Sequence, residues 1–553
     1  MTARLARGVA GGAMLIGAIT ILARVAGFAK QYAFAGTVGT NCLSTAYFTA
    51  NQIPNIIFEV VVGGALAGMV VPVLAGAAAA GQEASGGAGR ARVEAISSAL
   101  LTWVLLVLVP LGALTALLAG PVAGLFLGEV KGCDVADVQA VATRMLVVFA
   151  PQIPLYGVAV VLYGVLQAHK RFAGPALAPL VSSIVVIVAY LLFVPLSGDW
   201  AEAGGPSTAR GADLSTLPGG AELALSVGTS LGVLALVITV VGPIAGLGLR
   251  WRPSLRFPPG VAEQVRRLAL AGVAALLAQQ AAMVVVLLLA NKAVGTGAIA
   301  VYNYAWAIYL VPYAVLAVPI ATSAFPRLSA RAEAGETQAF SDLAAGAARA
   351  VVIVSGLAAG VLAATSEPGA AVFLWTKSDM PPSELARTIA LFAPGLIGYA
   401  LIAHLSRVLY AAGHGRAAAT GTVAGWGVVM VAQTVFALTF PDGWRIAGMA
   451  LGMSVGMTAG GVLLLASVVR LRGRGAAAGL GRAGLAAVAG GLAGYLAGAA
   501  AVTALGPGSF WGHIGAVLAG AVAALVAGGL VVALVDRADA TAVAGALVRG
   551  RRS

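Results

Sequence analysis

The segment 49–66, "TANQIPNIIFEVVVGGAL", carries polar side chains inside a run that is otherwise apolar. Asn51, Asn55 and Glu59 follow one another at intervals of four residues, which places them along one side of an α-helix. A carboxylate at the centre of a bilayer is costly unless it faces water or a partner. The spacing therefore predicts a polar stripe on the wall of a hydrated cavity. The alternative for Glu59 is a structural ion pair or a protonated group in the core.

Two residues beside the stripe, Gln52 and Pro54, also bear on the predicted cavity. Pro54 frees the backbone carbonyl of Ala50 from its helical hydrogen bond, because proline has no N–H to donate to it. The helix is expected to bend at this point, where its polar face meets the cavity. Gln52 is a further candidate for the cavity lining.

Basic side chains within the apolar runs are the other candidates for binding. Arg24 and Lys30 lie in the first run, and Arg407 lies near the end of a later one. Each has a second interpretation, in which the side chain extends to the membrane interface. Three polar residues are further candidates for the cavity wall or for hydrogen bonds between helices: Gln279, Gln280 and Asn303.

The patterns of known catalytic and cofactor sites are missing from the sequence. None of the five lysines follows a glycine, so a Walker A motif for ATP is excluded. The four histidines have no metal-ligand spacing, and neither H-E-x-x-H nor G-x-S-x-G occurs. We therefore expect no catalytic residues, no metal, no cofactor and no enzyme activity. Transport by this chain would be secondary or driven by a partner.

The elements that hold these residues are apolar helices. Of the 553 residues, 60% are hydrophobic and 10% are charged, a balance typical of a polytopic membrane protein. Runs of roughly 20 apolar residues recur along the whole chain. The sequence predicts an all-α protein with about fourteen transmembrane helices, over residues 8–29, 43–66, 95–120, 142–167, 174–196, 222–249, 268–290, 298–325, 343–365, 386–411, 418–440, 446–469, 480–503 and 512–535.

The distribution of charge predicts the orientation. Most of the 33 Lys and Arg residues fall on one side of these spans if the N-terminus is inside, and basic loops resist translocation. Both termini are thus expected in the cytoplasm and the protein in the plasma membrane of a bacterium. The net charge of +13 is explained by this asymmetry. Nucleic acid is not an expected partner, because no soluble basic domain is present.

Two segments resemble each other at an interval of six spans. The fourth span ends "YGVLQAHKRFAGPALAP" and the tenth ends "SRVLYAAGHGRAAATGT". Because six spans return the chain to its starting side, the repeats are expected to be parallel. This predicts an N-terminal lobe at 1–250, a C-terminal lobe at 251–475, and two extra helices with a tail at 476–553. Such transporters bind substrate between lobes that rock to give alternating access.

The chain has two cysteines. The predicted topology places Cys42 and Cys133 in extracytoplasmic loops, where disulfides persist. A bond between them is one hypothesis, and two isolated small apolar residues is the other.

A resemblance to a known family rests on blocks of sequence in a fixed order. The block "ARVAGFAKQYAFAGTVGT" leads to "LSTAYFTANQIPNIIFEVVVGGALAGMVVPVLA", and "YAWAIYLVPYAVLAVPIATSAFPRLS" and "LIAHLSRVLYAAGHGR" follow. Together they resemble the MurJ (MviN) lipid II flippases of the multidrug/oligosaccharidyl-lipid/polysaccharide exporter superfamily. The resemblance covers the first twelve spans.

This resemblance implies a fourteen-helix exporter whose cationic cavity turns over the undecaprenyl-pyrophosphate-linked precursor of peptidoglycan. It also implies that Arg24 and Lys30 contact the pyrophosphate. The chain departs from the family at three places: Phe58 and Glu59 replace arginines, Ala307 replaces an arginine, and Thr45 replaces a common Asp. The expected partners are the lipid-linked precursor, membrane lipids and proteins of cell-wall synthesis.

Alternatives to a lipid II flippase stay open at this stage. A cation-coupled drug exporter, or an exporter of another lipid-linked polysaccharide, would belong to the same superfamily. A non-transporting membrane scaffold for cell-wall assembly is a third hypothesis. A lipid II flippase requires the cations of the first helix. A drug exporter requires a protonatable carboxylate instead.

Overall fold

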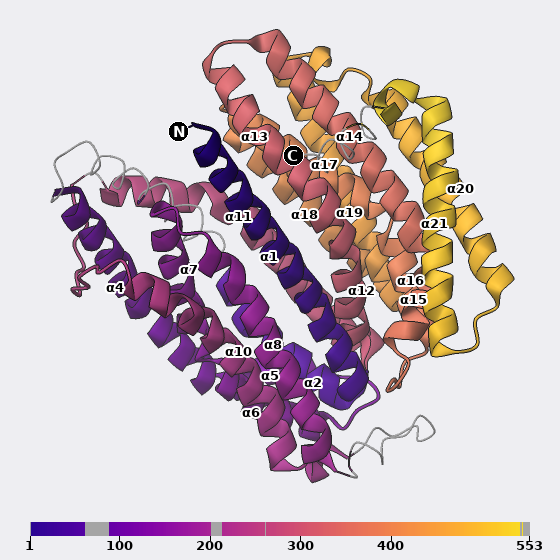
Figure 1. Cartoon of the computed structure of the whole chain (residues 1–553). Coiled ribbons are helices and arrows are strands. Elements are labelled where there is room, and N and C mark those ends of the chain that lie inside the picture. The colour runs from indigo at the N-terminus through magenta and orange to yellow at the C-terminus, as the bar shows by residue number, and fades with distance from the viewer. Residues whose placement is uncertain are drawn as a thin grey trace. The chain divides into compact units, whose positions relative to one another are not determined.

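The computed structural model describes residues 2–60, 74, 88–198, 200, 213–259, 261–541 and 545. Within these residues the regular structure is helical and contains no strand. The chain divides into two compact units (Figure 1). Unit 1 holds residues 1–280 and 295–297, and unit 2 holds residues 281–294 and 298–553. The lobe boundaries at residues 250 and 475 stay predictions.

The helices of unit 1 follow the expected apolar runs. They are α1 (Thr2–Thr37), α2 (Cys42–Phe58), α4 (Ala88–Leu117), α5 (Ala119–Leu127), α6 (Val135–Phe149), α7 (Gln152–Ala168), α8 (Ala173–Ser197), the short η2 (Leu214–Thr216), α10 (Gly219–Ala245) and the first part of α11 (Val261–Leu288).

Unit 2 begins within α11 and contains two π-helical turns. Its elements are η3 (Leu289–Val294), α12 (Ala298–Pro312), η4 (Tyr313–Ala317), α13 (Val318–Glu333), α14 (Thr337–Ala364), α15 (Ser366–Phe373), α16 (Pro382–Phe392), α17 (Gly395–Ala411), α18 (Gly415–Thr439), α19 (Arg445–Arg472), η5 (Arg474–Ala477), α20 (Leu480–Leu505) and α21 (Phe510–Val535).

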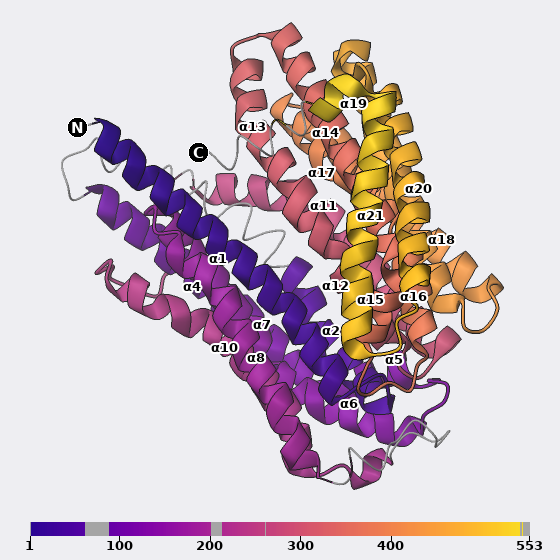
Figure 2. The same cartoon turned by 45° about the vertical axis from the view of Figure 1, so that its right-hand side comes forward.

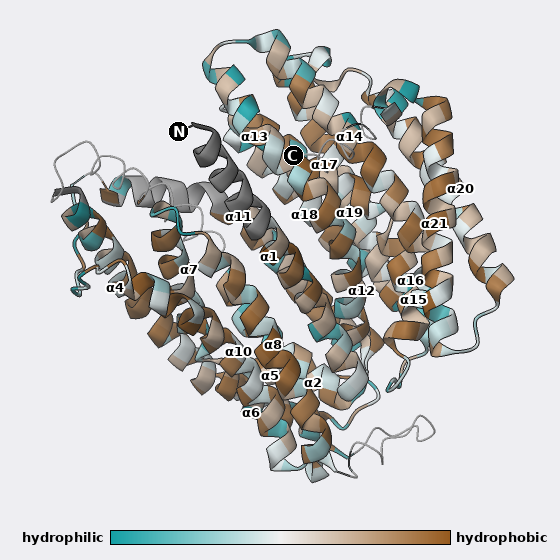
Figure 3. Cartoon of the chain, viewed as in Figure 1, coloured by the Kyte–Doolittle hydropathy of each residue, from teal (hydrophilic) through white to brown (hydrophobic). Residues whose placement is uncertain are grey.

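Length and hydropathy identify the membrane spans among the described residues. Eleven helices are long and apolar enough to cross a membrane, or up to 12 if the pair α16 and α17, bent by 44°, is one span. Counted with that pair, they match twelve of the fourteen predicted runs. Figure 3 shows hydrophobic residues distributed along these helices. The helices α1 and α2 occupy the other two runs without being counted among these spans. The all-helical membrane fold is confirmed, and the count of fourteen stays a prediction.

Unit 1 has its apolar core around α4, α7 and α10. Ile96, Leu100, Val161 and Val165 are buried there together with Val240. Lipid is as apolar as these side chains, so their transfer from lipid drives little of the packing. Close van der Waals contact stabilises the helix pairs instead.

Glycines bring the helices of unit 2 into close contact. A Cβ on Gly456 of α19 would lie 2.6 Å from the backbone N of Val429 on α18. The pair α20 and α21 is held in the same way, because a Cβ on Gly494 would lie 2.7 Å from the carbonyl oxygen of Ala524. Figures 1 and 2 show α20 and α21 side by side along their length.

Two ion pairs fasten the segment after α21 to unit 2. Asp536 is buried, and its Oδ1 lies 2.8 Å from Arg482 Nη2. Arg349 Nε lies 2.8 Å from Asp539 Oδ2, and Arg349 Nη1 donates to the carbonyl of Ala478 at 2.7 Å. The end of the last span is thereby tied to α14 and α20.

The charge of Asp536 makes this attachment sensitive to acid. Burial raises the pKa of the carboxyl. The Arg482 guanidinium and the Asp539 backbone N–H lower it by more than burial raises it, so that the pKa of Asp536 is below its usual value. The stabilisation is therefore present above the pKa of an unfolded aspartate, about 3.9. It is lost as the pH falls through the lower folded value.

We expect Asp536→Asn to lower the free energy of unfolding by about 1 kcal/mol at pH 7, measured by thermal unfolding in detergent. The difference from the wild type should shrink as the pH falls below about 4. Asp442→Asn is the control, because Asp442 is 89% exposed in its pair with Arg445. A pH-independent difference would contradict the assignment.

Candidate functional site

The two cations of α1 do not lie on the same face of that helix. Arg24 is exposed and Lys30 is half-buried. Six residues separate them, which turns the two side chains about 120° apart around the helix axis. Neither makes an ion pair or hydrogen bond within the described part of the chain. The structure does not bring these two candidates together within unit 1.

An aromatic cluster fixes the end of α1 that carries Lys30. The Tyr47 hydroxyl of α2 lies 2.7 Å from the hydroxyl of Tyr190 on α8 and 2.8 Å from Thr229 Oγ1 on α10. The ring of Phe34 on α1 lies 4.7 Å from that of Tyr47 and 5.0 Å from that of Tyr190. The cluster therefore holds α1, α2, α8 and α10 in one arrangement.

The polar stripe of α2 has a partner on α7. Asn51, Asn55 and Glu59 are all half-buried, as is Gln52. The Asn55 amide donates to the carbonyl of Asn51 at 2.9 Å and accepts from the Tyr156 hydroxyl at 3.2 Å. Asn55 thus joins α2 to α7. Among the described residues of the stripe, Asn55 is the one whose side chain hydrogen-bonds to another helix.

Sequence reasoning missed Tyr156. Its ring lies 4.3 Å from that of Phe58, which is three residues after Asn55 and so on the same face of α2. The helix α7 therefore makes a polar and an apolar contact with that face. The available signal was a pair of tyrosines, Tyr156 and Tyr163, in a long apolar run, and tyrosine hydroxyls need a hydrogen-bond partner when buried. Such a signal does not identify the partner.

We expect Tyr156→Phe to weaken the attachment of α2 to α7 by about 1 kcal/mol, since the ring remains and one hydrogen bond is lost. Thermal unfolding in detergent measures this. In a double-mutant cycle with Asn55→Leu, the two substitutions should be non-additive. Additive effects would show that the hydrogen bond does not stabilise the protein.

The remaining polar candidates are divided between the units. Gln279 is half-buried and Gln280 is buried, both on the part of α11 that belongs to unit 1. Asn303 on α12 and Arg407 on α17 are half-buried in unit 2. The Arg407 guanidinium donates to the carbonyl of Ala403 on its own helix.

A buried polar pair in unit 2 was not anticipated. The Gln433 amide on α18 donates to the Tyr302 hydroxyl on α12 at 2.8 Å, and both side chains are buried. A hydrogen bond of this kind between membrane helices fixes their register. Its position next to the close contact of α18 with α19 makes it part of the packing of this unit.

The two cysteines are bonded. The structure contains a disulfide between Cys42, at the start of α2, and Cys133, in the loop between α5 and α6, with a Cα–Cα distance of 5.8 Å. This is the bonded alternative of the two considered from the sequence. The side of the membrane on which it lies stays a prediction.

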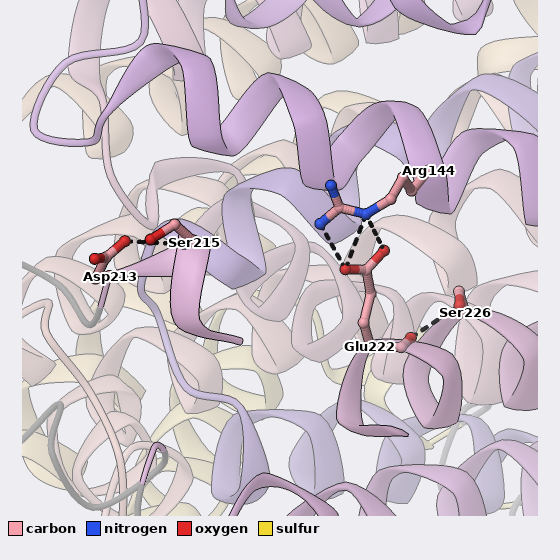
Figure 4. A network of polar contacts seen from close by, with 5 residues as sticks. All are labelled: Arg144, Asp213, Ser215, Glu222 and Ser226. Atoms are coloured by element: carbon pink, nitrogen blue, oxygen red, sulfur yellow. Dashed lines mark hydrogen bonds and ion pairs between the residues drawn. The ribbon is translucent and has the colours of Figure 1, made fainter. Parts of the chain in front are cut away.

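An exposed ion pair connects α6 with α10 (Figure 4). Arg144 Nη2 lies 2.7 Å from Glu222 Oε2, and Arg144 Nε lies 2.9 Å from Glu222 Oε1. Nearby, Asp213 accepts from the backbone N–H of Ser215 at 2.9 Å. Hydrogen bonding to Ser215 lowers the pKa of Asp213. The pairing uses the one cation of α6, so Arg144 is occupied structurally.

The described residues define a class of protein. They contain no group of three or more His, Cys, Asp or Glu side chains that could hold a metal ion. They form a multi-pass bundle of apolar helices in two units, with polar side chains and bases within the spans. Apolar spans that carry polar and basic side chains are typical of secondary transporters.

The family follows from the comparison of sequences. The profile of the family described as "Lipid II flippase MurJ" matches residues 34–520. The chain belongs to this family.

An individual relative agrees with this assignment. The "Lipid II flippase MurJ" of Burkholderia cenocepacia is 29% identical over 184 residues, which are 33% of this chain and 34% of the relative. The matched stretch thus spans about a third of that relative's length.

Solved structures show the same fold. "Lipid II flippase MurJ, inward closed conformation" superimposes with a TM-score of 0.70 at 18% identity, over 94% of this chain and 98% of that one. An inward-facing multidrug resistance MATE family transporter of the MOP superfamily has a TM-score of 0.62 at 16% identity, over 82% and 94%. At these identities the likeness concerns the fold alone.

Proposed function

We propose that this protein is a flippase that moves the undecaprenyl-pyrophosphate-linked peptidoglycan precursor, lipid II, across the bacterial plasma membrane by alternating access. The observation that supports this most is the family match over residues 34–520. It extends over most of both units of the chain, so most of the transporter body is family-like.

The cations of α1 are the proposed contacts of the pyrophosphate. A diphosphate cannot enter hydrocarbon without cationic or hydrogen-bonding partners. Arg24 and Lys30 precede the matched range, so their role is supported by the sequence resemblance and by their charge. Because they lie on different faces of α1, we propose that they contact the head group from two sides or at successive stages.

The stripe of α2 supplies the amide groups and the carboxylate of the same lining. Asn51, Gln52 and Glu59 are half-buried and would present amide and carboxylate groups to the cargo or its water. Glu59 would balance the charge of the bases. The energy would come from the membrane potential, about 2.3 kcal/mol per elementary charge per 100 mV, or from a coupled cation.

The deciding experiment is depletion of the protein in its host, followed by measurement of the lipid-linked precursor that accumulates on the cytoplasmic face. Accumulation of lipid II that is reversed by the wild-type gene supports the proposal. Normal lipid II with accumulation of another lipid-linked oligosaccharide would reject this cargo, and normal levels of all such lipids would reject the flippase.

A cation-coupled drug exporter is the second candidate. The observation that favours it is Glu59, a half-buried carboxylate at a place where the resemblance implies arginine in many members of the family. This function predicts that Glu59→Gln abolishes drug efflux and that the bases of α1 are dispensable. A scaffold without transport predicts that substitution of either group has no effect while the protein still reaches the membrane.

A further inference from the structure

A short glycine-rich segment is bound to unit 1 by hydrogen bonds. The segment is Gly295–Thr296–Gly297, which precedes α12. The Thr296 N–H donates to the carbonyl of Lys131 at 2.9 Å, and Thr296 Oγ1 donates to the same oxygen at 3.0 Å. The Gly297 N–H donates to Thr45 Oγ1 on α2 at 2.9 Å.

Two glycines make this close approach possible. Gly295 has a φ of +117°, and a Cβ there would lie 2.5 Å from the carbonyl oxygen of Lys131. On the other side, Gly132 has a φ of +82°, and its Cβ would lie 2.5 Å from Thr296 Oγ1. Both positions need a left-handed backbone and the absence of a side chain. The two loops are therefore fitted to each other.

The disulfide joins the two parts of unit 1 that bind this segment. Thr45 lies in the first turn of α2, which Cys42 begins, and Lys131 lies two residues before Cys133. Cys133 Sγ lies 3.2 Å from Thr296 Oγ1. The covalent bond thus fixes the distance between the two groups that accept hydrogen bonds from the segment.

The chain changes units at this segment. Residues 281–294 and residues from 298 onward belong to unit 2, whereas 295–297 belong to unit 1. Thr45, Lys131 and both cysteines also belong to unit 1, so these hydrogen bonds lie within one unit. Release of the segment would remove its hydrogen bonds to Thr45 of α2 and to the loop that carries Lys131.

We propose that the Cys42–Cys133 disulfide, Thr45, Lys131 and the segment 295–297 form a redox-sensitive clasp. Reduction by a dithiol would transfer two electrons and two protons to the cystine, giving two thiols and oxidised dithiol. The loop that carries Lys131 is then free to move from the start of α2, and the segment loses its binding site. The clasp controls how firmly the segment 295–297 is held against α2 and the loop that carries Lys131, whatever the cargo is.

Hydrogen exchange of the backbone amides tests the clasp in the full-length protein in detergent. In the double variant Cys42→Ser, Cys133→Ser, the amides of Thr296 and Gly297 should exchange about tenfold faster or more. Reduction of the wild type with dithiothreitol should reproduce this increase. Unchanged exchange at both amides after confirmed reduction would overturn the proposal.

Two comparisons separate the clasp from a general loss of stability. Thr45→Val removes one acceptor and leaves the disulfide, so it should accelerate exchange at Gly297 more than at Thr296. Amides of α20 and α21 should be unaffected in the cysteine variant. Equal acceleration in α20 and α21 would also overturn the proposal. Because no readout involves transport, failure here leaves the flippase proposal untouched.

Discussion

The double substitution Arg24→Ala, Lys30→Ala is expected to reduce transport of the lipid-linked precursor roughly 100-fold or more. A hydrogen bond to a charged group contributes about 1.5 to 3 kcal/mol, and the pyrophosphate would lose two such partners within the membrane. Each single alanine variant should have an intermediate effect. Since the two side chains lie on different faces of α1, neither base can substitute fully for the other.

The measurement is complementation of the depleted host, with quantification of precursor on the cytoplasmic face. Arg24→Lys and Lys30→Arg keep the charge and should retain most activity. Arg470→Ala and Arg474→Ala are matched controls, because these arginines are exposed at and beyond the end of α19. Full complementation by the double alanine variant, at normal protein levels, would show that the bases of α1 do not bind the cargo.

The apolar runs predicted most of the fold because membrane helices must satisfy their backbone hydrogen bonds internally. Hydropathy does not detect where such a helix bends. The run 386–411 was expected to be one span, but the structure divides it at Ala393 and Pro394 into α16 and α17, with a bend of 44°. Conversely, the run 298–325 continues to Glu333 through the π-helical turn η4. Local backbone geometry determines the bend and the π-helical turn, and the hydropathy pattern carries little information on it.

The site was only partly predictable for a related reason. A spacing of four residues identified the face of α2 that carries Asn51, Asn55 and Glu59, because helical periodicity is a local property. The partner of Asn55 is Tyr156, which lies 101 residues away in the sequence. Only the packing of α2 against α7 brings them together. The angular separation of Arg24 and Lys30 could have been read from their spacing of six residues.

Glycine composition illustrates the same limit. With 74 glycines, small-residue motifs occur by chance, and the sequence does not show which ones bring helices together. In the structure, a Cβ on Gly452 would lie 2.5 Å from the backbone N of Gln433, whereas Gly427 has no atom within 4 Å of its Cβ position. The two glycines differ only in what the neighbouring helix places beside them.

Gly452→Leu is therefore expected to destabilise unit 2 severely. The new side chain would collide with the backbone of α18, because its Cβ would also lie 2.7 Å from Gln433 Cα and 2.8 Å from the carbonyl carbon of Ala432. This backbone cannot move without separating α18 from α19. The displacement would also pull Gln433 away from the Tyr302 hydroxyl. Overpacking of this kind costs about 3 kcal/mol or more.

Thermal unfolding and yield of monodisperse protein in detergent measure this loss of stability. Gly427→Leu is the matched control on α18, and it should behave like the wild type because its side chain enters open space. Gly452→Ala should be intermediate, since one methyl group already meets the backbone of Gln433. If Gly452→Leu melted at the wild-type temperature, α18 and α19 could not be in the direct backbone contact on which the packing of unit 2 depends.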